Sequence, residues 1–364
     1  MTPDPIHLEP RIVEIGPVPI MWRAFPRTTQ FFSTWLDERS WNPHRGFRII
    51  SLATLPRLLR LIQSPDTDLI VVHSSQFSPW DWRGLSRVVF RRSVLSGNFP
   101  LFRGLGPQLI RFNNKTPIAG LDLDDPPAIA RSNLFLLDKA TVFFKRELPP
   151  DHWRVFAGTV HRSVPTPRFR AVAKHQKQIA KLAPISLGIS TEVFDWLGAN
   201  PIPHVEKTTD VFFAGRLQGS SSVRVSGIEE LLSLRAEGLR IDISQERLPI
   251  GDYLERCARA RIVFAPEGFG WQSFRLYEAP LCGTVPLCNR PTIERYQPLL
   301  DGVHALYYDP EPGALREAVK SALVDRERLR QIAAAGRERV LDHHTPLAIA
   351  RHVAAATLGR VQSS

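Results

Sequence analysis

The chain has 364 residues, of which 43% are hydrophobic and 23% charged, a composition typical of a soluble globular protein with room for two domains. No apolar run approaches the roughly 18 residues that span a bilayer, and the first residues, MTPDPIHLEP, lack the features of a secretory signal. The net charge of +11 indicates a surface that attracts polyanions, whether nucleic acid, anionic lipid or phosphorylated substrate. Three cysteines without metal-type spacing favour reduced thiols and a cytoplasmic protein.

The first half of the chain alternates short apolar runs with longer segments of helical character, which predicts an α/β unit with a parallel sheet. Buried strands are expected at residues 11–16, 47–51, 68–74, 117–125 and 140–148, with a further extended piece at 184–190. Residues 194–210 are rich in Pro, Gly and polar side chains, and they predict a linker.

The alternation of strands and helices restarts after this linker. Strands are expected at residues 210–216, 239–244, 260–265, 283–288 and 304–309. The remainder of the chain is predicted to be helical, with Leu315, Val319 and Leu323 forming an apolar stripe. A second short helix is expected to end at Gly336.

These patterns predict an α/β protein with two doubly wound, Rossmann-like domains that face each other across a cleft. The first domain is expected over residues 1–200 and the second over residues 201–345. Residues 346–364 are expected to form a C-terminal helix that packs back on the first domain.

The most informative segment is residues 264–293, FAPEGFGWQSFRLYEAPLCGTVPLCNRPTI. A predicted strand is followed by a loop with Gly268 and Gly270, and then by a helix that carries Arg275 and Glu278. Open α/β sheets bind ligands beyond the carboxyl ends of their strands, where helix N-termini present free N–H groups to phosphate. Glycines let the backbone approach the ligand, and a carboxylate one turn into the helix can reach the hydroxyls of a ribose. The segment therefore predicts a nucleotide site, with a tight turn beside a surface glutamate as the alternative.

Two arginines near the first strand of the second domain extend this prediction. Arg216 ends the apolar run FFAGR, and Arg224 follows in the Ser-rich loop GSSSVR. A nucleoside diphosphate that leaves during a reaction develops negative charge, which fixed arginines and N–H groups can neutralise without a metal. We therefore expect a diphosphate site that needs neither a metal nor a further cofactor. The alternative is that these arginines form salt bridges.

The order of strand, Gly-containing loop, Arg-x-x-Glu and small-x-Gly-x-Val-Pro resembles the donor half of GT-B glycosyltransferases. The group-one, exostosin-like and spore-coat-like branches are the most similar, over residues 209–350. The resemblance implies an enzyme that moves a sugar from a nucleotide-diphosphate donor to a hydroxyl acceptor, with Glu278 on the ribose and Arg224 in place of a family lysine. Retaining group-one enzymes carry two glutamates seven residues apart, whereas Glu267 and Glu278 lie eleven apart. This departure favours an inverting reaction.

An inverting reaction needs a general base, which the first domain is expected to supply. The candidates follow predicted strands: Asp122 and Asp124 in GLDLDDPP, and His73 in VVHSS. Adjacent carboxylates raise one another's pKa, which suits a base. The same aspartates, with Asp125, could instead bind a divalent ion or begin a turn.

Two further features of the first half admit two interpretations each. Lys145–Glu147, in FKREL, resembles a recurring element of the spore-coat-like branch and either lines the cleft or is a solvated strand end. Gly16, in GPVP, either admits the acceptor or makes a plain turn.

The segment PWDWRGLSRVVFRR raises the prospect of peripheral membrane contact. Arg83, Arg87 and Arg91 would share one helical face near Trp80 and Trp82. Such a face can lie on an anionic membrane, which would suit a lipid-linked rather than a free glycan acceptor. A solvated basic face is the alternative.

Two other function classes share some of these features. A sugar-nucleotide epimerase or a phosphorylase of GT-B fold would use the same nucleotide or phosphate site. A nucleic-acid-binding protein would use the positive charge, but the sequence has no basic tail, zinc spacing or nucleic-acid motif to support it.

Overall fold

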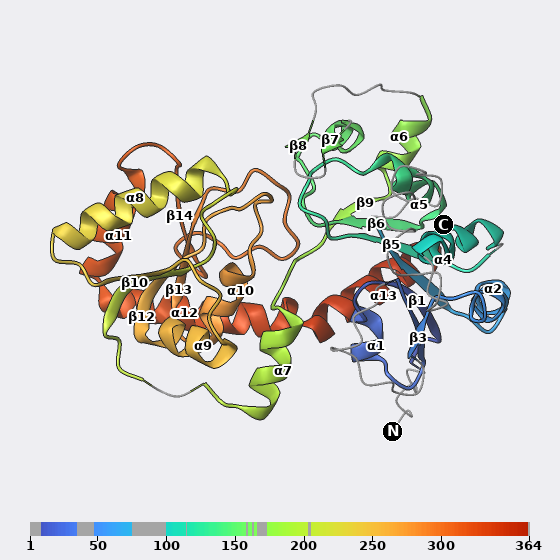
Figure 1. Cartoon of the computed structure of the whole chain (residues 1–364), viewed down its shortest axis with the longest axis horizontal. Helices are drawn as coiled ribbons and strands as arrows, with labels where there is room; N and C mark the ends of the chain where they lie inside the picture. Colours follow the sequence, from blue (N-terminus) through green and yellow to red (C-terminus); the bar gives the residue numbers. More distant parts are fainter. Residues whose placement is uncertain are drawn as a thin grey trace.

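The computed structural model of the chain describes residues 9–34, 47–74, 100–113, 115–157, 159–161, 164–165, 173–202 and 205–362. Two separate parallel sheets dominate it, one of 7 strands and one of 5 strands, and Figure 1 shows them side by side with their helices around them. Each sheet has a cluster of buried apolar side chains on both faces. The predicted pair of doubly wound α/β sheets is therefore present.

The first sheet has the strand order β3-β2-β1-β4-β5-β6-β9, and all its neighbouring strands are parallel. The strands β1, β4 and β5 are buried along their whole length, which explains why they are largely apolar in the sequence, with Glu14 as the one charged residue in the interior of these strands. The strand bounds are β1 Ile12–Gly16, β2 Thr29–Ser33, β3 Phe47–Ile49, β4 Leu69–His73, β5 Ile118–Asp122, β6 Val142–Lys145 and β9 Leu182–Pro184. A two-stranded antiparallel pair, β7 Thr159–His161 and β8 Val164–Pro165, lies beyond β6 in the chain.

Helices cover both faces of this sheet. Its helical elements are α1 Ile20–Ala24, α2 Leu55–Gln63, α4 Pro100–Gln108, η1 Leu109–Phe112, η2 Arg131–Asn133, α5 Leu134–Lys139, η3 His152–Phe156 and α6 Ala173–Ile179. The last helix of the chain, α13 Pro346–Gln362, also packs here: Ile349, Ala350 and Val353 share a buried cluster with Met21 and the strands. Figure 1 shows α13, in red, running beneath the first sheet.

The second sheet has the strand order β11-β10-β12-β13-β14 and is also parallel throughout. Its strands are β10 Thr209–Ala214, β11 Ile241–Ser244, β12 Ala260–Phe264, β13 Val285–Asn289 and β14 Leu306–Tyr308. Its helices are α8 Ser222–Ala236, α9 Ile250–Arg259, α10 Phe274–Leu281, α11 Ala314–Val324 and α12 Arg326–His343.

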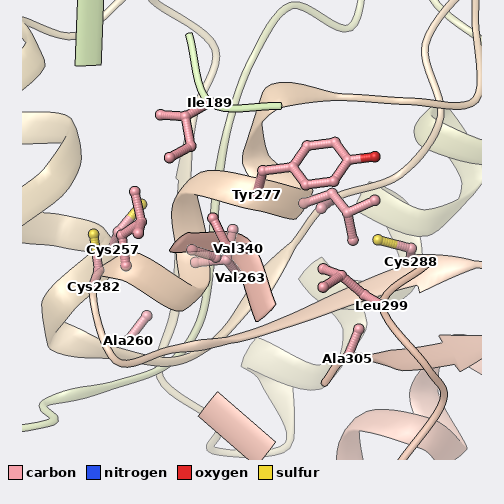
Figure 2. Close-up of a cluster of buried hydrophobic side chains, with 14 of the residues drawn as sticks. Ile189, Cys257, Ala260, Val263, Tyr277, Cys282, Cys288, Leu299, Ala305 and Val340 are labelled. Atoms are coloured by element: carbon pink, nitrogen blue, oxygen red, sulfur yellow. The ribbon is translucent and has the colours of Figure 1, made fainter. Parts of the chain in front are cut away.

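The chain crosses from the first sheet to the second through residues 185–190 and α7 Thr191–Ala199. Ile189 of this crossover packs in the same buried cluster as Tyr277 of α10, and Figure 2 shows the two side chains on neighbouring segments. Cys257, Cys282 and Cys288 also lie in this cluster as free, buried thiols. The crossover is therefore part of the core of the second unit.

Three local predictions were wrong. The predicted linker begins inside a helix, α7. The strand β2 was missed because Thr29, Gln30 and Ser33 interrupt its apolar pattern. The helix α12 continues through Gly336 instead of ending there, and a Cβ at that position would lie 2.6 Å from the backbone oxygen of His304. This glycine permits close packing and does not end the helix.

Within the described residues, no helix is long and apolar enough to cross a membrane.

Candidate functional site

A cavity of about 600 Å³ opens at the carboxyl ends of β10 and β11. This is the edge at which open α/β sheets hold their ligands. The walls come from four segments: residues 214–216 after β10, residues 245–253 after β11 and into α9, the start of α10, and residues 190–193 of the crossover. The cavity thus lies in the second unit, where the crossover reaches it.

Glu278 forms part of the cavity wall, as expected from its place one turn into α10. Its side chain is 4% exposed; one carboxylate oxygen accepts from the backbone N–H of Ser190 at 3.3 Å and the other from the hydroxyl of Tyr253 at 3.0 Å. Burial raises the pKa of Glu278, and these two bonds oppose the shift. The carboxylate is therefore held in one orientation, and each oxygen keeps a lone pair for a ligand hydroxyl.

Arg275, in the first turn of α10, lies against the end of β10. Its Nη1 donates to the backbone oxygen of Ala214 at 3.0 Å, and its guanidinium lies over the ring of Phe213, 5.1 Å from the ring centre. A Cβ at Gly215 would come within 3.2 Å of the same Nη1. The glycine after β10 therefore makes room for this arginine.

Arg224, in the first turn of α8, approaches the same point from the other side. Its guanidinium donates to the backbone oxygens of Arg216 at 3.2 Å and Pro266 at 3.5 Å, and no ion pair to it is found among the described residues. Burial, and then repulsion by Arg275, lowers the pKa of Arg224 to about 10. A Cβ at Gly268 would lie 2.7 Å from its Nη2. Two residues predicted from separate motifs, Arg224 and Gly268, are thus in contact, while Arg216 is exposed at the cavity edge.

Buried polar atoms without partners gather around these arginines. Arg224 Nε and Ser220 Oγ lie at the start of α8, and Arg275 Nε and Ser273 Oγ lie at the start of α10. Each unsatisfied buried group costs about 1–3 kcal/mol, so such groups in a folded protein need an explanation. Two helix N-termini, each with a buried arginine Nε and a buried serine hydroxyl that lack a partner, indicate a site for an anion.

Gly270 lies on the opposite side of the loop, against the first unit. A Cβ there would come within 2.8 Å of the Glu147 carboxylate and 3.0 Å of Arg146 Nη2. The segment Lys145–Glu147 therefore reaches the loop between β12 and α10 and does not end in solvent. Burial raises the pKa of Glu147, against the opposing effect of Arg146 and of two backbone N–H groups.

His73, a candidate base, is buried inside the first unit with 4% exposure. Its Nε2 lies 3.2 Å from the carboxylate of Glu14, which also accepts from the first N–H groups of α1. A Cβ at Gly16 would lie 2.3 Å from the imidazole ring. Gly16 therefore provides space for His73 and not for a substrate.

The aspartate cluster at the end of β5 is largely neutralised by cations. Asp122 is 2% exposed and lies 3.4 Å from Lys145 Nζ, while Asp125 lies 2.7 Å from Arg146 Nη2. Asp124 is only partly buried. In the described part of the chain no three His, Cys, Asp or Glu side chains gather in a way that could hold a metal.

Several site residues were missed by sequence reasoning. Tyr253 and Ser190 come from a helix and a crossover without any motif, and only the fold brings them to Glu278. Ser273 could have been found, because it immediately precedes the predicted helix that carries Arg275. Ser220 was harder to find, because the sequence predicted a loop around Arg224. The basic face of Arg83, Arg87 and Arg91 lies outside the described residues.

Comparison with known proteins agrees with this geometry. A family model described as glycosyl transferase-like matches residues 223–355, which include α8, the loop after β12 and α10. No sequence among the curated proteins matches the chain.

The chain is similar in fold to many solved structures. Sucrose-phosphate synthase from Thermosynechococcus elongatus matches with a TM-score of 0.53 and 12% identity, covering 97% of this chain and 100% of that one. A UDP-forming trehalose-phosphate synthase from Burkholderia xenovorans, in complex with glucose-6-phosphate, matches with a TM-score of 0.54 and 11% identity over 96% of this chain and 100% of its own. The Anabaena protein HepE, in complex with UDP and glucose, matches with a TM-score of 0.52 and 12% identity over 97% of this chain and 100% of its own.

These comparisons confirm the predicted GT-B fold over nearly the whole chain. They also confirm the predicted enzyme class, because the segment that holds the arginines and Glu278 is a glycosyl transferase-like domain. The roles of individual residues are not tested by them.

Proposed function

We propose that this GT-B glycosyltransferase moves a sugar from a nucleoside-diphosphate donor, bound by its C-terminal domain, to a hydroxyl acceptor bound by its N-terminal domain. The observation that carries the proposal is the meeting of two helix N-termini whose Arg224 and Arg275 each keep a buried nitrogen without a partner. A diphosphate supplies the acceptor oxygens that these groups lack. We assign residues 1–200 to the acceptor domain and 201–345 to the donor domain, with the C-terminal helix, 346–364, joining them.

The ribose of the donor is assigned to Glu278. Its carboxylate is held by Ser190 and Tyr253 at the wall of the cavity that adjoins the two arginines. A fixed carboxylate accepts hydrogen bonds from both ribose hydroxyls without having to be ordered on binding, which lowers the entropic cost. The rest of the cavity then holds the nucleobase.

Departure of the nucleoside diphosphate is assisted by Arg224 and Arg275, with Arg216 at the exposed edge. Negative charge grows on the leaving oxygen in the transition state, and cations already fixed at that point stabilise it without reorganisation. Gly268 lets the loop after β12 pack against Arg224, and Gly270 lets the same loop pack against Glu147 of the first unit. We therefore propose a metal-independent reaction in which arginines stabilise the leaving diphosphate in place of a metal ion.

The acceptor side is assigned to Asp124, with inversion at the anomeric carbon. Of the three candidate bases, His73 and Asp122 are buried and engaged with Glu14 and Lys145, whereas Asp124 is partly exposed. The neighbouring Asp125 pairs with Arg146 at 2.7 Å, and Arg146 also donates to the backbone oxygen of Gln272 at 3.0 Å, so this segment lies beside the loop after β12. Asp124 would take the proton of a glycan or lipid-linked hydroxyl as it attacks.

The donor proposal is tested by thermal unfolding with nucleoside diphosphates, beginning with UDP. A ligand at a hundredfold its dissociation constant adds about 2.7 kcal/mol to the stability of the folded state. Glu278→Ala should lose most of this shift while keeping the fold. Glu327→Ala, which removes an exposed carboxylate of α12, is the matched control and should keep the full shift. No shift with any nucleoside diphosphate would exclude the proposed donor.

The reaction itself is tested with a labelled nucleotide sugar. Transfer requires an acceptor and releases the nucleoside diphosphate, whereas an epimerase changes the donor sugar alone. The anomeric configuration of the product, read by NMR, tests inversion, and Asp124→Asn should lower the turnover number with little effect on donor affinity. A product that retains configuration would exclude the role of Asp124 as the base.

A further inference from the structure

Glu147 is the point at which the acceptor domain holds the donor loop, residues 267–273. It follows β6 directly and is 2% exposed. Its carboxylate accepts from the backbone N–H of Trp271 at 2.7 Å, from that of Gln272 at 3.1 Å and from Arg146 Nε at 3.1 Å. A carboxylate that is buried and engaged three times acts on structure, because it has no free face toward a substrate.

Gln272 of the donor loop makes further hydrogen bonds to the acceptor domain. Its side-chain nitrogen donates to the backbone oxygens of Arg146 at 2.7 Å and Ile185 at 3.1 Å, and its side-chain oxygen accepts from the backbone N–H of Leu187 at 2.8 Å. Arg146 Nη2 in turn donates to the backbone oxygen of Gln272 at 3.0 Å. The loop is therefore held by a set of buried bonds, of which those to Glu147, Arg146 and Ile185 join the donor loop to the acceptor domain.

The contact continues along the loop to the diphosphate site. Gly270 lies against Glu147 with no room for a Cβ, and its backbone oxygen accepts from the N–H of Gly268 at 2.9 Å. Gly268 in turn lies against Arg224, again with no room for a Cβ. Any shift of the loop away from Glu147 therefore changes the position of the backbone that Arg224 packs against.

We propose that Glu147 is a positioning residue for the donor site: the acceptor domain uses it to fix the donor loop, and through that loop the guanidinium of Arg224. This inference rests on the proposed function and adds to it. The donor site is complete only when the two domains are joined at Glu147, so donor affinity and turnover depend on a residue that touches neither the donor nor the reacting atoms.

The first test uses Glu147→Gln with Glu294→Gln as its matched control. Glu294 also joins the two domains, through His152 at 3.1 Å, but it is 40% exposed and does not contact the donor loop. The amide introduced by Glu147→Gln keeps one acceptor and turns an N–H donor toward the second loop N–H, so one bond is lost. Hydrogen exchange at the amides of Trp271 and Gln272 should rise about tenfold or more in Glu147→Gln and stay unchanged in the control.

The second measurement is the affinity for UDP and the steady-state kinetics of transfer. We expect the donor dissociation constant and donor KM to rise about tenfold in Glu147→Gln, with the acceptor KM unchanged, because the loss of one charge-assisted bond displaces the loop. Glu294→Gln should match the natural protein. Gly270→Ala provides a second route to the same displacement and should reproduce both results, so the proposal stays testable if Glu147→Gln does not fold.

The outcomes separate this inference from the proposed function. If the natural protein binds no nucleoside diphosphate, the proposed function fails and this inference fails with it. If the natural protein binds and the loop amides exchange faster in Glu147→Gln and Gly270→Ala with donor affinity unchanged, the proposed function stands and the positioning role is refuted. Equal losses in Glu147→Gln and Glu294→Gln would also refute it, because they would report a general loss of domain contact.

Discussion

The carboxyl edges of the two sheets carry charged groups in two different states. In the first sheet, His73 lies in hydrogen-bonding distance of Glu14 and Asp122 is paired with Lys145, and all four side chains are buried. In the second sheet Arg224 and Arg275 hold only backbone oxygens, and each keeps a buried nitrogen without a partner. The same position in the fold therefore holds satisfied pairs in one sheet and buried nitrogens without partners in the other.

The difference shows that a charge at a strand end is not by itself a sign of catalysis. A buried ion pair whose two members satisfy each other stabilises the local structure and has nothing left for a substrate. A buried cation without an acceptor is costly, and it persists where a ligand supplies what the protein does not. Structural charges therefore differ from charges that can bind a ligand in whether the protein supplies a partner, and not in residue type.

The largest expected effect is the loss of stability when a buried ion pair is broken. Lys145 is fully buried, and its ammonium lies 3.4 Å from Asp122 and 2.6 Å from the backbone oxygen of Pro126. Lys145→Met leaves the Asp122 carboxylate buried without a cation, which should lower the free energy of unfolding by about 3–5 kcal/mol. Urea unfolding measures the loss. The double variant Lys145→Met with Asp122→Asn should recover part of it, and a single variant as stable as the natural protein would contradict the structural role of the pair.

The next effect concerns a buried arginine without an ion-pair partner, whose loss should weaken ligand binding more than it lowers stability. Arg224→Gln should weaken binding of UDP by about 1.5–3 kcal/mol, because a charge-assisted contact to the diphosphate is lost. The free energy of unfolding without ligand should fall far less than in Lys145→Met, since no ion pair is broken and only hydrogen bonds to two backbone oxygens are lost. Isothermal titration calorimetry and urea unfolding measure the two quantities. Arg330→Gln, which removes an exposed arginine of α12, is the control and should change neither.

A fall in stability equal to that of Lys145→Met would show that Arg224 is a structural charge like Lys145. The carboxyl edges of the two sheets would then not differ in this respect.

A third, smaller effect concerns the junction between the domains, where both ring nitrogens of His344 have hydrogen-bond partners. Its Nε2 donates to the backbone oxygen of Gln297 at 3.0 Å, and its Nδ1 accepts from the hydroxyl of Ser186 at 2.8 Å. Burial lowers the pKa of His344 to about 3. Because the unfolded chain takes up this proton near pH 6.5 and the folded protein does not, stability falls as pH drops from about 6.5 toward 3, by about 1.4 kcal/mol per pH unit.

The measurement is urea unfolding at several pH values for the natural protein and His344→Gln. The carboxylates titrate alike in both proteins, so the difference between the two curves isolates this histidine. The curve of the variant should be flatter between pH 6.5 and 5. Parallel curves would show that His344 can take up a proton in the folded state.

Much of the fold, and the segment that forms the candidate site, could be predicted from the sequence for a physical reason. The strand β4 is buried on both faces, so it appears in the sequence as an apolar run whatever its neighbours are. Glu278 and Gly268 lie within one motif, and their relation to the strand end is local in the chain. Such patterns are local in the chain, so they can be recognised without knowing the strand order.

The acceptor side could not be predicted in the same way, because its pairings depend on strand order. Asp122 and Lys145 are direct register partners on β5 and β6, which only the assembled sheet reveals. The role of Glu147 depends on contacts with Trp271 and Gln272, more than 100 positions away in the chain. A sequence shows that these residues are charged or polar, but it does not show which partner neutralises the charge or forms the hydrogen bond.

The smallest effect comes from the amino edge of the second sheet, where a paired charge remains close to water. Asp210 accepts from Arg240 and from Arg261 Nη1, the latter at 3.1 Å. Burial acts to raise the pKa of Asp210, but the bonds from Arg240 outweigh it and the pKa lies below its usual value. The pair therefore stabilises the fold above about pH 4 and loses this effect as pH falls through the lowered pKa. Asp210→Asn should cost only about 1 kcal/mol at pH 7, because Arg240 stays largely solvated. Urea unfolding at pH 7 measures it, and a loss as large as that of Lys145→Met would mean that pairing alone, and not burial of the pair, sets the strength of these contacts.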